Sequence, residues 1–238
     1  MDERVLAAAE NDARWCDLVC RAHGISTATQ PGHWAALQRP PDVFPDAITL
    51  LPSATAADVL RSAQDDSGCS VRDSFAALDL ASLGFDELSE AQWLFRAPAL
   101  PTVTAAALWS DVETGEELAE WAQAAGASDT YRRELLGEAP VRFLALRGKD
   151  GLRAGAVATW SASVVGVTIV FTRKLTAHEA WKGLATAVAG HFPAVPLVCR
   201  AQGEGRKAAL AHGFVETGPL RVWRRPVEGA ASQSPGAD

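Results

Sequence analysis

The sequence predicts an α+β protein in which a mixed, mostly antiparallel sheet is flanked by helices. Three β-rich segments follow one another at residues 141–147, 152–161 and 164–172, and the turn Gly148-Lys149-Asp150-Gly151 separates the first two. Such short connections favour an antiparallel meander. Segments with helical periodicity precede and follow the meander. The 238 residues, 48% of them hydrophobic, suffice for a sizeable core.

The first part of the chain predicts a helix over residues 3–23 that ends at Gly24. Several prolines up to Pro45 then predict an extended connection. Beyond it we expect a strand, a helix that begins at Ser53 or Thr55, a second strand, a short helix and a third strand. Their ranges are 47–51, 53–64, 69–73, 75–83 and 90–96.

The second part begins after Pro98 and Pro101, which interrupt the chain. We expect a strand, a helix and a short helical piece before the meander, and a helix, a strand, a helix and a final strand after it. Before the meander the ranges are 103–112, 113–126 and 131–136. After it they are 177–190, 193–200, 205–212 and a strand that ends at 220–224. Small and polar residues predict that the tail, 227–238, is disordered.

Both parts show the same order of elements, which predicts an internal repeat. In each, a β-rich run precedes a helix, a strand with a cysteine, an Ala/Leu-rich helix, a Gly-Phe pair and a strand with a tryptophan. Cys69 lies 15 residues before Gly84, and Cys199 lies 14 residues before Gly213. We therefore divide the chain into a truncated first copy, 1–101, a second copy, 102–226, and the tail.

Charge and hydropathy exclude two classes of partner. The net charge is -7 and the pI about 5.3, so non-specific binding to a phosphate backbone lacks its main attraction. No apolar run approaches the roughly 18 residues that cross a bilayer. The start Met1-Asp2-Glu3-Arg4 has the wrong charge for a secretory signal. We expect a cytoplasmic protein that binds neither nucleic acid nor membranes.

Four cysteines without a CxxC pair predict reduced thiols rather than a disulfide framework. Cys16, Cys20 and His23 fall on one helix face, at a spacing that could serve zinc. Trp15 and Val19 lie beside them, so the alternative is the buried face of an amphipathic helix. We predict no metal site.

The second part resembles the GNAT superfamily of N-acyltransferases over about residues 103–225. The most specific stretch runs from Ala208 to Trp223, where a helix leads into Gly213-Phe214 and a closing strand. The resemblance implies a GNAT-like mixed sheet. By extension, residues 1–101 are similar to a degenerate, truncated copy of the same unit, as in tandem members of the superfamily.

The resemblance also implies a place for acyl-CoA, between a fourth and a fifth strand that splay apart. Pantetheine would pair with the fourth strand as an added β-strand. Carried onto this chain, the backbone of Ile169, Val170 and Phe171 would hold it. The β-segment that ends at Thr172 would then have to diverge from the segment through Cys199.

For the pyrophosphate, the family uses a glycine-rich turn at a helix N-terminus. The matching residues 172–179 contain no glycine. Arg173 and Lys174, beside a helix start at Thr176 and Ala177, could still hold an anion by charge and by the helix end. The alternative is that both cations are solvated loop charges.

Catalytic residues are not assigned. Many members carry a tyrosine four residues before the Gly-Phe glycine, where this chain has Ala209. The single tyrosine, Tyr131, belongs to another segment. Between Ala154 and Phe171 there is no carboxylate or imidazole to act as a general base. Attack by an amine that arrives neutral needs only positioning and an oxyanion donor.

These observations predict an acyl-CoA-dependent N-acyltransferase that transfers an acetyl group from acetyl-CoA, or another acyl group from its acyl-CoA, to an amine. The expected partner is a small-molecule amine, and the acidic net charge slightly favours a cationic one. A catalytically inactive GNAT-like protein that binds a ligand or partner is the alternative, because the glycine turn and the tyrosine are missing. The chain would be a monomer or a homodimer.

Overall fold

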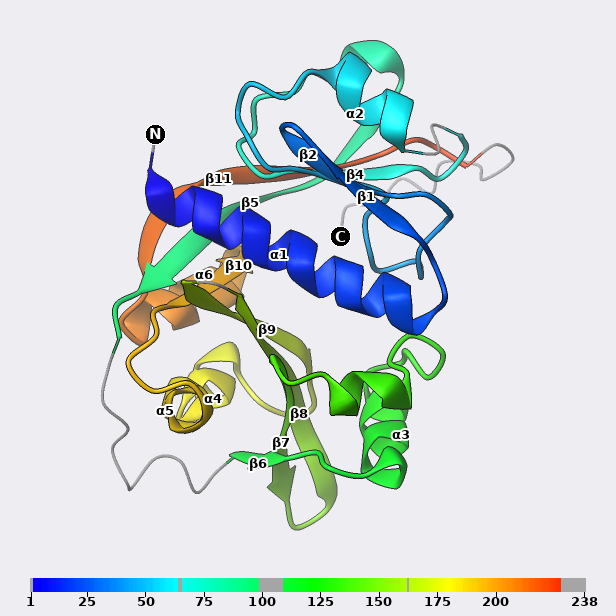
Figure 1. The fold of residues 1–238 in the computed structure, drawn as a ribbon. Helices are drawn as coiled ribbons and strands as arrows, with labels where there is room; N and C mark the ends of the chain where they lie inside the picture. The colour runs from blue at the N-terminus through cyan, green and yellow to red at the C-terminus, as the bar shows by residue number, and fades with distance from the viewer. Residues whose placement is uncertain (1, 64–65, 99–108, 162, 228–238) are drawn as a thin grey trace, which may run out of the picture.

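The computed structural model describes residues 2–63, 66–98, 109–161 and 163–227 (Figure 1). These residues form one eleven-stranded mixed sheet flanked by helices, which confirms the predicted α+β class. The strand order is β1-β2-β3-β4-β11-β5-β10-β9-β8-β7-β6.

The strands and helices have the following bounds. The strands are β1 (Thr27–Gln30), β2 (His33–Ala36), β3 (Ala47–Thr49), β4 (Ser70–Asp73), β5 (Asp86–Arg96), β6 (Trp109–Asp111), β7 (Val141–Gly148), β8 (Gly151–Ser161), β9 (Val164–Thr172), β10 (Leu197–Ala201) and β11 (Val215–Arg224). The helices are α1 (Glu3–Ala22), α2 (Ala56–Ser62), α3 (Gly115–Ala124), α4 (Ala177–Trp181), α5 (Leu184–His191) and α6 (Gly203–Ala211), with 3-10 turns η1 (Ala81–Leu83) and η3 (Arg133–Gly137).

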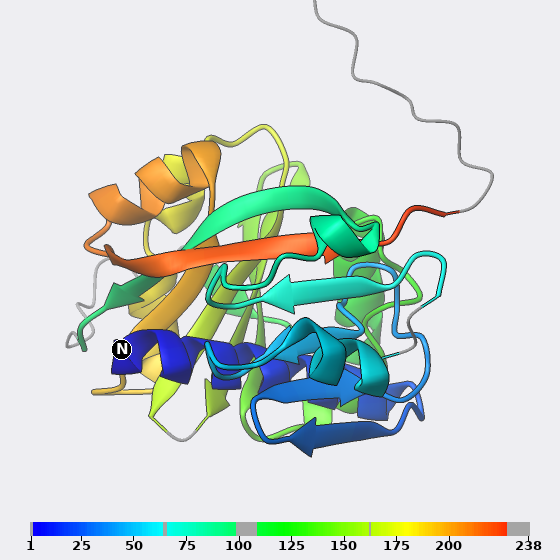
Figure 2. The ribbon, with the colours of Figure 1, turned by 90° about the horizontal axis from the view of Figure 1, so that it is seen from above.

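Helices cover the two faces of the sheet in different cores. The apolar sides of α1 and α3 pack together on one face, around Trp15, Trp121 and Phe143. On the other face, α4, α5 and α6 pack on β6 to β10, with Trp181 and Phe214 in contact. α2 packs on β2 and β3 at the far end of the sheet (Figures 1 and 2). The space between β9 and β10 is therefore approached by different helices from its two sides.

Two strands are exchanged between the parts of the chain. β5, from the first part, lies between β10 and β11, and β11, from the second part, lies between β4 and β5. A strand of the first part, β5, is thus paired with β10 of the second part, and a strand of the second part, β11, is paired with β4 of the first part. The division at residues 101 and 102, and the repeat itself, stay predictions.

Most predicted elements are present, and three differ. The helix expected over 177–190 is divided into α4 and α5, because Gly183 has a left-handed φ of 79°. The helix expected over 75–83 is only the turn η1. The buried Asp73 carboxylate accepts hydrogen bonds from the backbone amides of Phe75 and Leu78, and Ala76 has a φ of 50°, which is incompatible with a helix.

The third difference concerns the proline-rich connection, which contains the antiparallel pair β1 and β2. Residues 103–108 of the strand expected over 103–112 lie outside the described residues, as does the tail from 228. No helix in the described residues is long and apolar enough to cross a membrane.

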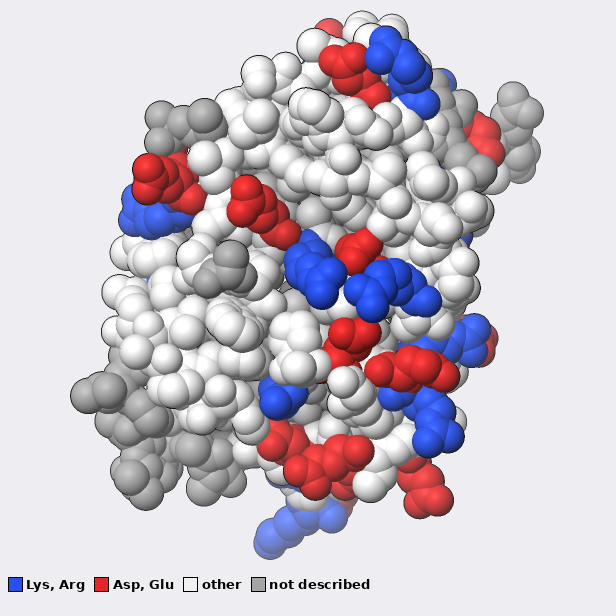
Figure 3. Space-filling view, viewed as in Figure 1, with Lys and Arg blue, Asp and Glu red and all other residues white. Residues whose placement is uncertain are grey.

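Charges of both signs are interspersed on the face that α1 crosses (Figure 3). Along α1, Arg14 and Arg21 pair with Asp17 at 3.1 and 4.0 Å, and Arg21 also reaches Glu138 at 3.6 Å. Such exposed pairs contribute little stability. Over the described part of this face, acidic and basic side chains therefore alternate.

Candidate functional site

β9 and β10 run parallel and separate after a short contact. Their register contains two residue pairs, Leu197 with Val165 and Val198 with Gly166. Beyond that point β10 stays paired with β5 up to Ala201, and β9 stays paired with β8 up to Thr172. The two strands therefore diverge toward their carboxyl ends, as the sequence predicts, and leave a gap within the sheet.

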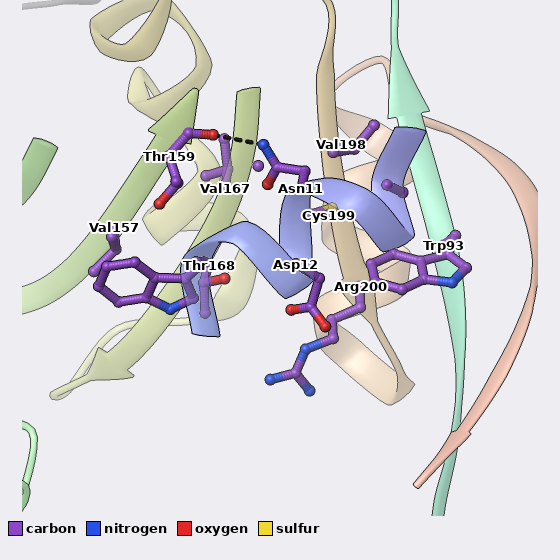
Figure 4. Close-up of a pocket in the computed structure, with 13 residues that line it drawn as sticks. Asn11, Asp12, Trp93, Val157, Thr159, Val167, Thr168, Val198, Cys199 and Arg200 are labelled. Atoms are coloured by element: carbon purple, nitrogen blue, oxygen red, sulfur yellow. Dashed lines mark hydrogen bonds between the residues drawn. The ribbon is translucent and has the colours of Figure 1, made fainter. Parts of the chain in front are cut away.

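Asn11 of α1 fixes the point where the strands separate. Its buried side chain donates a hydrogen bond from Nδ2 to the Thr159 carbonyl at 2.8 Å (Figure 4). The same Nδ2 donates to the Ser161 hydroxyl at 2.9 Å. Its Oδ1 lies where a Cβ on Gly166 would be. Gly166 is the last residue of β9 that pairs with β10, and a glycine is required there for α1 to pack this closely.

A β-bulge changes which β9 side chains border the gap. The register with β8 skips between Gly155 and Ala156, so Val170 is the extra residue of β9. Ile169 borders the gap. Phe171 instead packs in the α1–α3 core, with its ring 5.3 Å from that of Trp121. The predicted pantetheine contact concerns the backbone of residues 169–171, and the structure places the side chain of Ile169 at the gap and that of Phe171 away from it.

A cavity of about 330 Å³ occupies the gap next to α4 and α6. β9 forms one wall, β10 with β5 and β11 forms the other, and the two helices border it. Its lining residues are Ser89, Ala91, Val167, Thr168, Ile169, Thr172, Ala177, Trp181, Arg200, Ala201, Gln202, Gly205 and Val222.

The residues predicted to hold a pyrophosphate are dispersed. Arg173 donates a hydrogen bond to the Ala124 carbonyl, at 2.9 Å, and so reaches the end of α3. Lys174 is exposed, with a φ of 52°. Ala177 lines the 330 Å³ cavity, and Thr176 caps α4.

The α4 N-terminus already carries a negative charge. The Thr176 hydroxyl accepts from the Glu179 amide, and the Glu179 carboxylate accepts from the Thr176 amide at 2.8 Å. These hydrogen bonds, the one from the Thr176 backbone above all, lower the pKa of Glu179. The carboxylate occupies the position that a pyrophosphate would need, so this helix end does not fit one.

The α6 N-terminus, by contrast, has no side-chain cap. It begins with Gln202-Gly203-Glu204-Gly205, and both Gln202 and Gly205 line the 330 Å³ cavity. The family resemblance implied glycines after the fourth strand of the unit, whereas this pair follows the fifth strand and was not predicted. The Gly-x-Gly spacing at a helix start was the signal that could have found it.

A second cavity, of about 240 Å³, lies next to α1. Both parts of the chain contribute to it. It meets the first cavity at the gap, because Thr168, Ile169 and Arg200 line both. Its lining residues are Asp12, Trp15, Val43, Phe44, Arg72, Ala125, Ala127, Tyr131, Thr168, Ile169 and Arg200.

Three charged side chains stand together at this junction. Arg72 of β4 is buried and forms an ion pair with Asp12 of α1. Arg200 of β10 is exposed and lines both cavities. The positive charge of Arg72, together with desolvation in the cleft, lowers the pKa of Arg200 to about 10. Arg200 therefore remains charged at neutral pH.

The cysteines and the tyrosine are placed as follows. All four thiols are buried, and burial raises the pKa of Cys199 far above its usual value, so that it is not a nucleophile. Cys16 and Cys20 lie in the α1 core, and His23 contacts the Thr130 carbonyl. Within the described ranges, no group of three His, Cys, Asp or Glu residues could hold a metal ion. Burial raises the pKa of Tyr131 to about 12, so its phenol stays a hydrogen-bond donor at neutral pH.

No protein-family model and no curated sequence matches this chain. Solved structures do resemble it. A GCN5-related N-acetyltransferase from Kribbella flavida has a TM-score of 0.60 and 15% identity, over 94% of this chain and 97% of its own. A GNAT-family protein from Novosphingobium aromaticivorans has a TM-score of 0.57 and 12% identity, over 91% and 97%. A functionally unknown conserved protein from Staphylococcus epidermidis has a TM-score of 0.55 and 8% identity, over 84% and 93%. The chain therefore has the GNAT fold, as its Gly-Phe step and strand order predict.

Proposed function

We propose that this protein is an acyl-CoA-dependent N-acyltransferase. The observation that carries the proposal is the divergence of β9 from β10, with a 330 Å³ cavity in the gap. The GNAT neighbours support acyl transfer in general. Fold alone does not establish chemistry. Acyl transfer by this protein therefore requires that the gap can hold a thioester carrier.

The pantetheine arm suits this gap. Beyond Gly166 the edge of β9 that faces β10 is no longer paired with it, while the opposite edge stays in the ladder with β8. An extended amide chain could add to that free edge as a further strand. The backbone of Thr168, Ile169 and Val170 would pair with it, and Ala201 and Trp181 would contact it from the sides.

The phosphate end would need a different holder from the usual one, because Glu179 occupies the α4 N-terminus. Lys174 is exposed nearby, and the α6 N-terminus carries uncapped amides at Gly203 to Gly205. We infer that Lys174 and these amides hold the pyrophosphate, whereas Arg173 is engaged with α3.

The transfer itself is balanced without a covalent enzyme intermediate. A neutral amine adds its lone pair to the thioester carbonyl carbon, a C–N bond forms and the C–S bond breaks. The thiolate then takes up the proton that the nitrogen releases. The protein would contribute by orienting the two substrates at the junction of the cavities, beside Thr168 and Arg200. In this scheme the acceptor is a small-molecule amine in the 240 Å³ cavity.

Calorimetry with acetyl-CoA tests the proposal, with Gly205→Trp and Gly190→Trp as a matched pair. A Cβ on either glycine meets no atom within 4 Å, so both variants should fold. Gly205 lines the 330 Å³ cavity, and Gly190 on α5 does not. We expect the native chain and Gly190→Trp to bind, and Gly205→Trp to bind at least tenfold more weakly.

A catalytically inactive module that binds another ligand is the second candidate. It is favoured by one observation, the Glu179 carboxylate at the helix end where the family holds its pyrophosphate. Absence of both heat and a thermal shift for the native chain at millimolar acetyl-CoA would refute the transferase and leave this candidate. Binding that Gly205→Trp fails to weaken would place the cosubstrate outside the gap.

A further inference from the structure

We propose that the acceptor is an amine that also carries a carboxylate, and that Arg200 binds this carboxylate in the 240 Å³ cavity. The inference rests on the proposed function and specifies its substrate class. It starts from an unbalanced charge at the point where the two cavities meet.

Arg200 has no partner within the part of the chain that the structure describes. It donates no hydrogen bond and forms no ion pair there. Asp12 forms an ion pair with Arg72, and its charge also acts on Arg200, so that one carboxylate faces two guanidinium groups. Figure 4 shows Asp12 and Arg200 extending from α1 and β10 into the same space. Since Asp12 neutralises Arg72, the junction keeps a net positive charge at Arg200.

The charge of Arg200 is repelled by the second guanidinium beside it. Arg72 lies close enough to lower the pKa of Arg200 to about 10, which means that the charged form is disfavoured in the free protein. An anionic group bound in the cavity would relieve this repulsion. The local charge therefore favours an anionic group on the acceptor, in contrast to the cationic acceptor that the net charge of -7 slightly favours.

The shape of the site favours a carboxylate on a small apolar body. A guanidinium offers two parallel donors that match the two oxygens of a carboxylate. The cavity, at about 240 Å³, is smaller than a typical drug-sized pocket of roughly 300–1,000 Å³. Its other walls include the rings of Trp15, Phe44 and Tyr131. An amino acid with an apolar side chain has these properties.

The position of Arg200 also explains how such an acceptor would be oriented. Arg200 lines both cavities, together with Thr168 and Ile169 of β9, whose backbone we assign to the thioester arm. An amine that is one carbon away from the bound carboxylate would lie close to this gap. Arg200 would thus be a binding and positioning residue rather than an acid or base.

The test measures ligand binding to the full chain without acetyl-CoA. The probes are L-phenylalanine, 3-phenylpropionate, 2-phenylethylamine and inorganic phosphate, each titrated by calorimetry. We expect L-phenylalanine and 3-phenylpropionate to bind, and 2-phenylethylamine, which lacks the carboxylate, to bind at least tenfold more weakly. Arg200→Gln should remove this preference. Arg147→Gln, which changes an arginine paired with Glu120 at 3.0 Å outside the cavity, should keep it.

Several outcomes would overturn the inference. These are equal affinity for 2-phenylethylamine and 3-phenylpropionate, an undiminished preference in Arg200→Gln, no binding of any probe, or binding of phosphate alone. Acetyl-CoA titrated into the same sample separates the two proposals. Acetyl-CoA binding without carboxylate binding removes only this inference. Carboxylate binding without acetyl-CoA binding removes the transferase and, with it, the role of the bound molecule as an acceptor.

If acetylated L-phenylalanine is formed, kinetics give a second readout. Arg200→Gln should then raise the KM for L-phenylalanine at least tenfold and change the KM for acetyl-CoA less than threefold. The contrary result is an equal fall in kcat for L-phenylalanine and 2-phenylethylamine, with the ratio of their KM values unchanged. Arg200 would then act on the thioester rather than on the acceptor carboxylate, which contradicts the proposed role.

Discussion

The sheet contains two parallel strand pairs, β9 with β10 and β3 with β4, that begin alike and end differently. Each pair has a register of two residue pairs. In each, the second strand is paired on its other side with a long antiparallel strand from the other part of the chain, β5 for β10 and β11 for β4. The two pairs therefore sit in equivalent places: β3, β4 and β11 follow one another from one side of the sheet, and β9, β10 and β5 follow one another from the other side.

Side chains close one of these pairs and leave the other open. At β3 and β4, the Thr49 hydroxyl donates to the Asp73 carboxylate at 3.3 Å and accepts from the Ser74 amide at 2.8 Å. Asp73 then anchors the chain that follows. At β9 and β10, two cavities meet at the gap, and Arg200 projects into them. The same strand arrangement is therefore closed by hydrogen bonds in one place and left open in the other, according to the residues at the divergence.

Replacement of Asp73, which closes the β3–β4 pair, should give the largest loss of stability. Asp73→Ala deletes a fully buried carboxylate that serves the amides of Phe75 and Leu78 and the Thr49 hydroxyl. We expect the free energy of unfolding to fall by about 3–4 kcal/mol, since three donors lose their acceptor. Urea denaturation measures it. Asp73→Asn, which keeps one acceptor oxygen, should lose less, and equal losses would show that charge rather than hydrogen bonding matters here.

The second largest loss of stability is expected at Gly166, where β9 separates from β10. Gly166→Ala places a methyl group against the Asn11 amide, so we expect a loss of about 2–3 kcal/mol in unfolding free energy. Gly205→Ala, in open space, serves as the control. In Asn11→Ala the added methyl has room, and the double variant should therefore lose less than the sum of the two single ones. Strict additivity would mean that α1 does not define where the strands separate.

The smallest effect has the opposite sign. Arg200→Gln should raise the free energy of unfolding at pH 7 by up to about 1 kcal/mol, or Tm by roughly 2–4 °C, once solvent screening is allowed for. The pKa of Arg200 is lowered in the folded state, so its charge opposes folding below about pH 10. This penalty begins to fall as the pH rises through that value and is gone only above the ordinary, higher pKa of arginine in the unfolded chain. A decrease in Tm at pH 7 would reveal a stabilising partner for Arg200 and weaken the case for an anion site.

Much of the fold could be predicted from the sequence because it depends on local signals. The helix starts at Thr55 and Thr176 follow from N-cap chemistry, and the meander follows from β-rich runs joined by short turns. The divergence of β9 and β10 followed from a family resemblance in the Gly213-Phe214 region rather than from any residue in those strands.

The remaining features depend on contacts between distant segments. The role of Arg200 becomes visible only when Asp12 and Arg72 are brought beside it, more than a hundred residues away in sequence. Phe171 is turned into the core by a bulge that no composition reveals. Likewise, a strand pattern does not say which partner a strand chooses, so the positions of β5 and β11 could not be predicted.

The interleaved positions of β5 and β11 in the sheet have a consequence for cleavage of the backbone. A cut in the backbone between residues 98 and 109 would leave two fragments held together by main-chain hydrogen bonds along β5, because its neighbours β10 and β11 both belong to the later fragment. The later fragment alone would hold β9 and β10 but would lack Ser89 and Ala91 of β5, which line the 330 Å³ cavity.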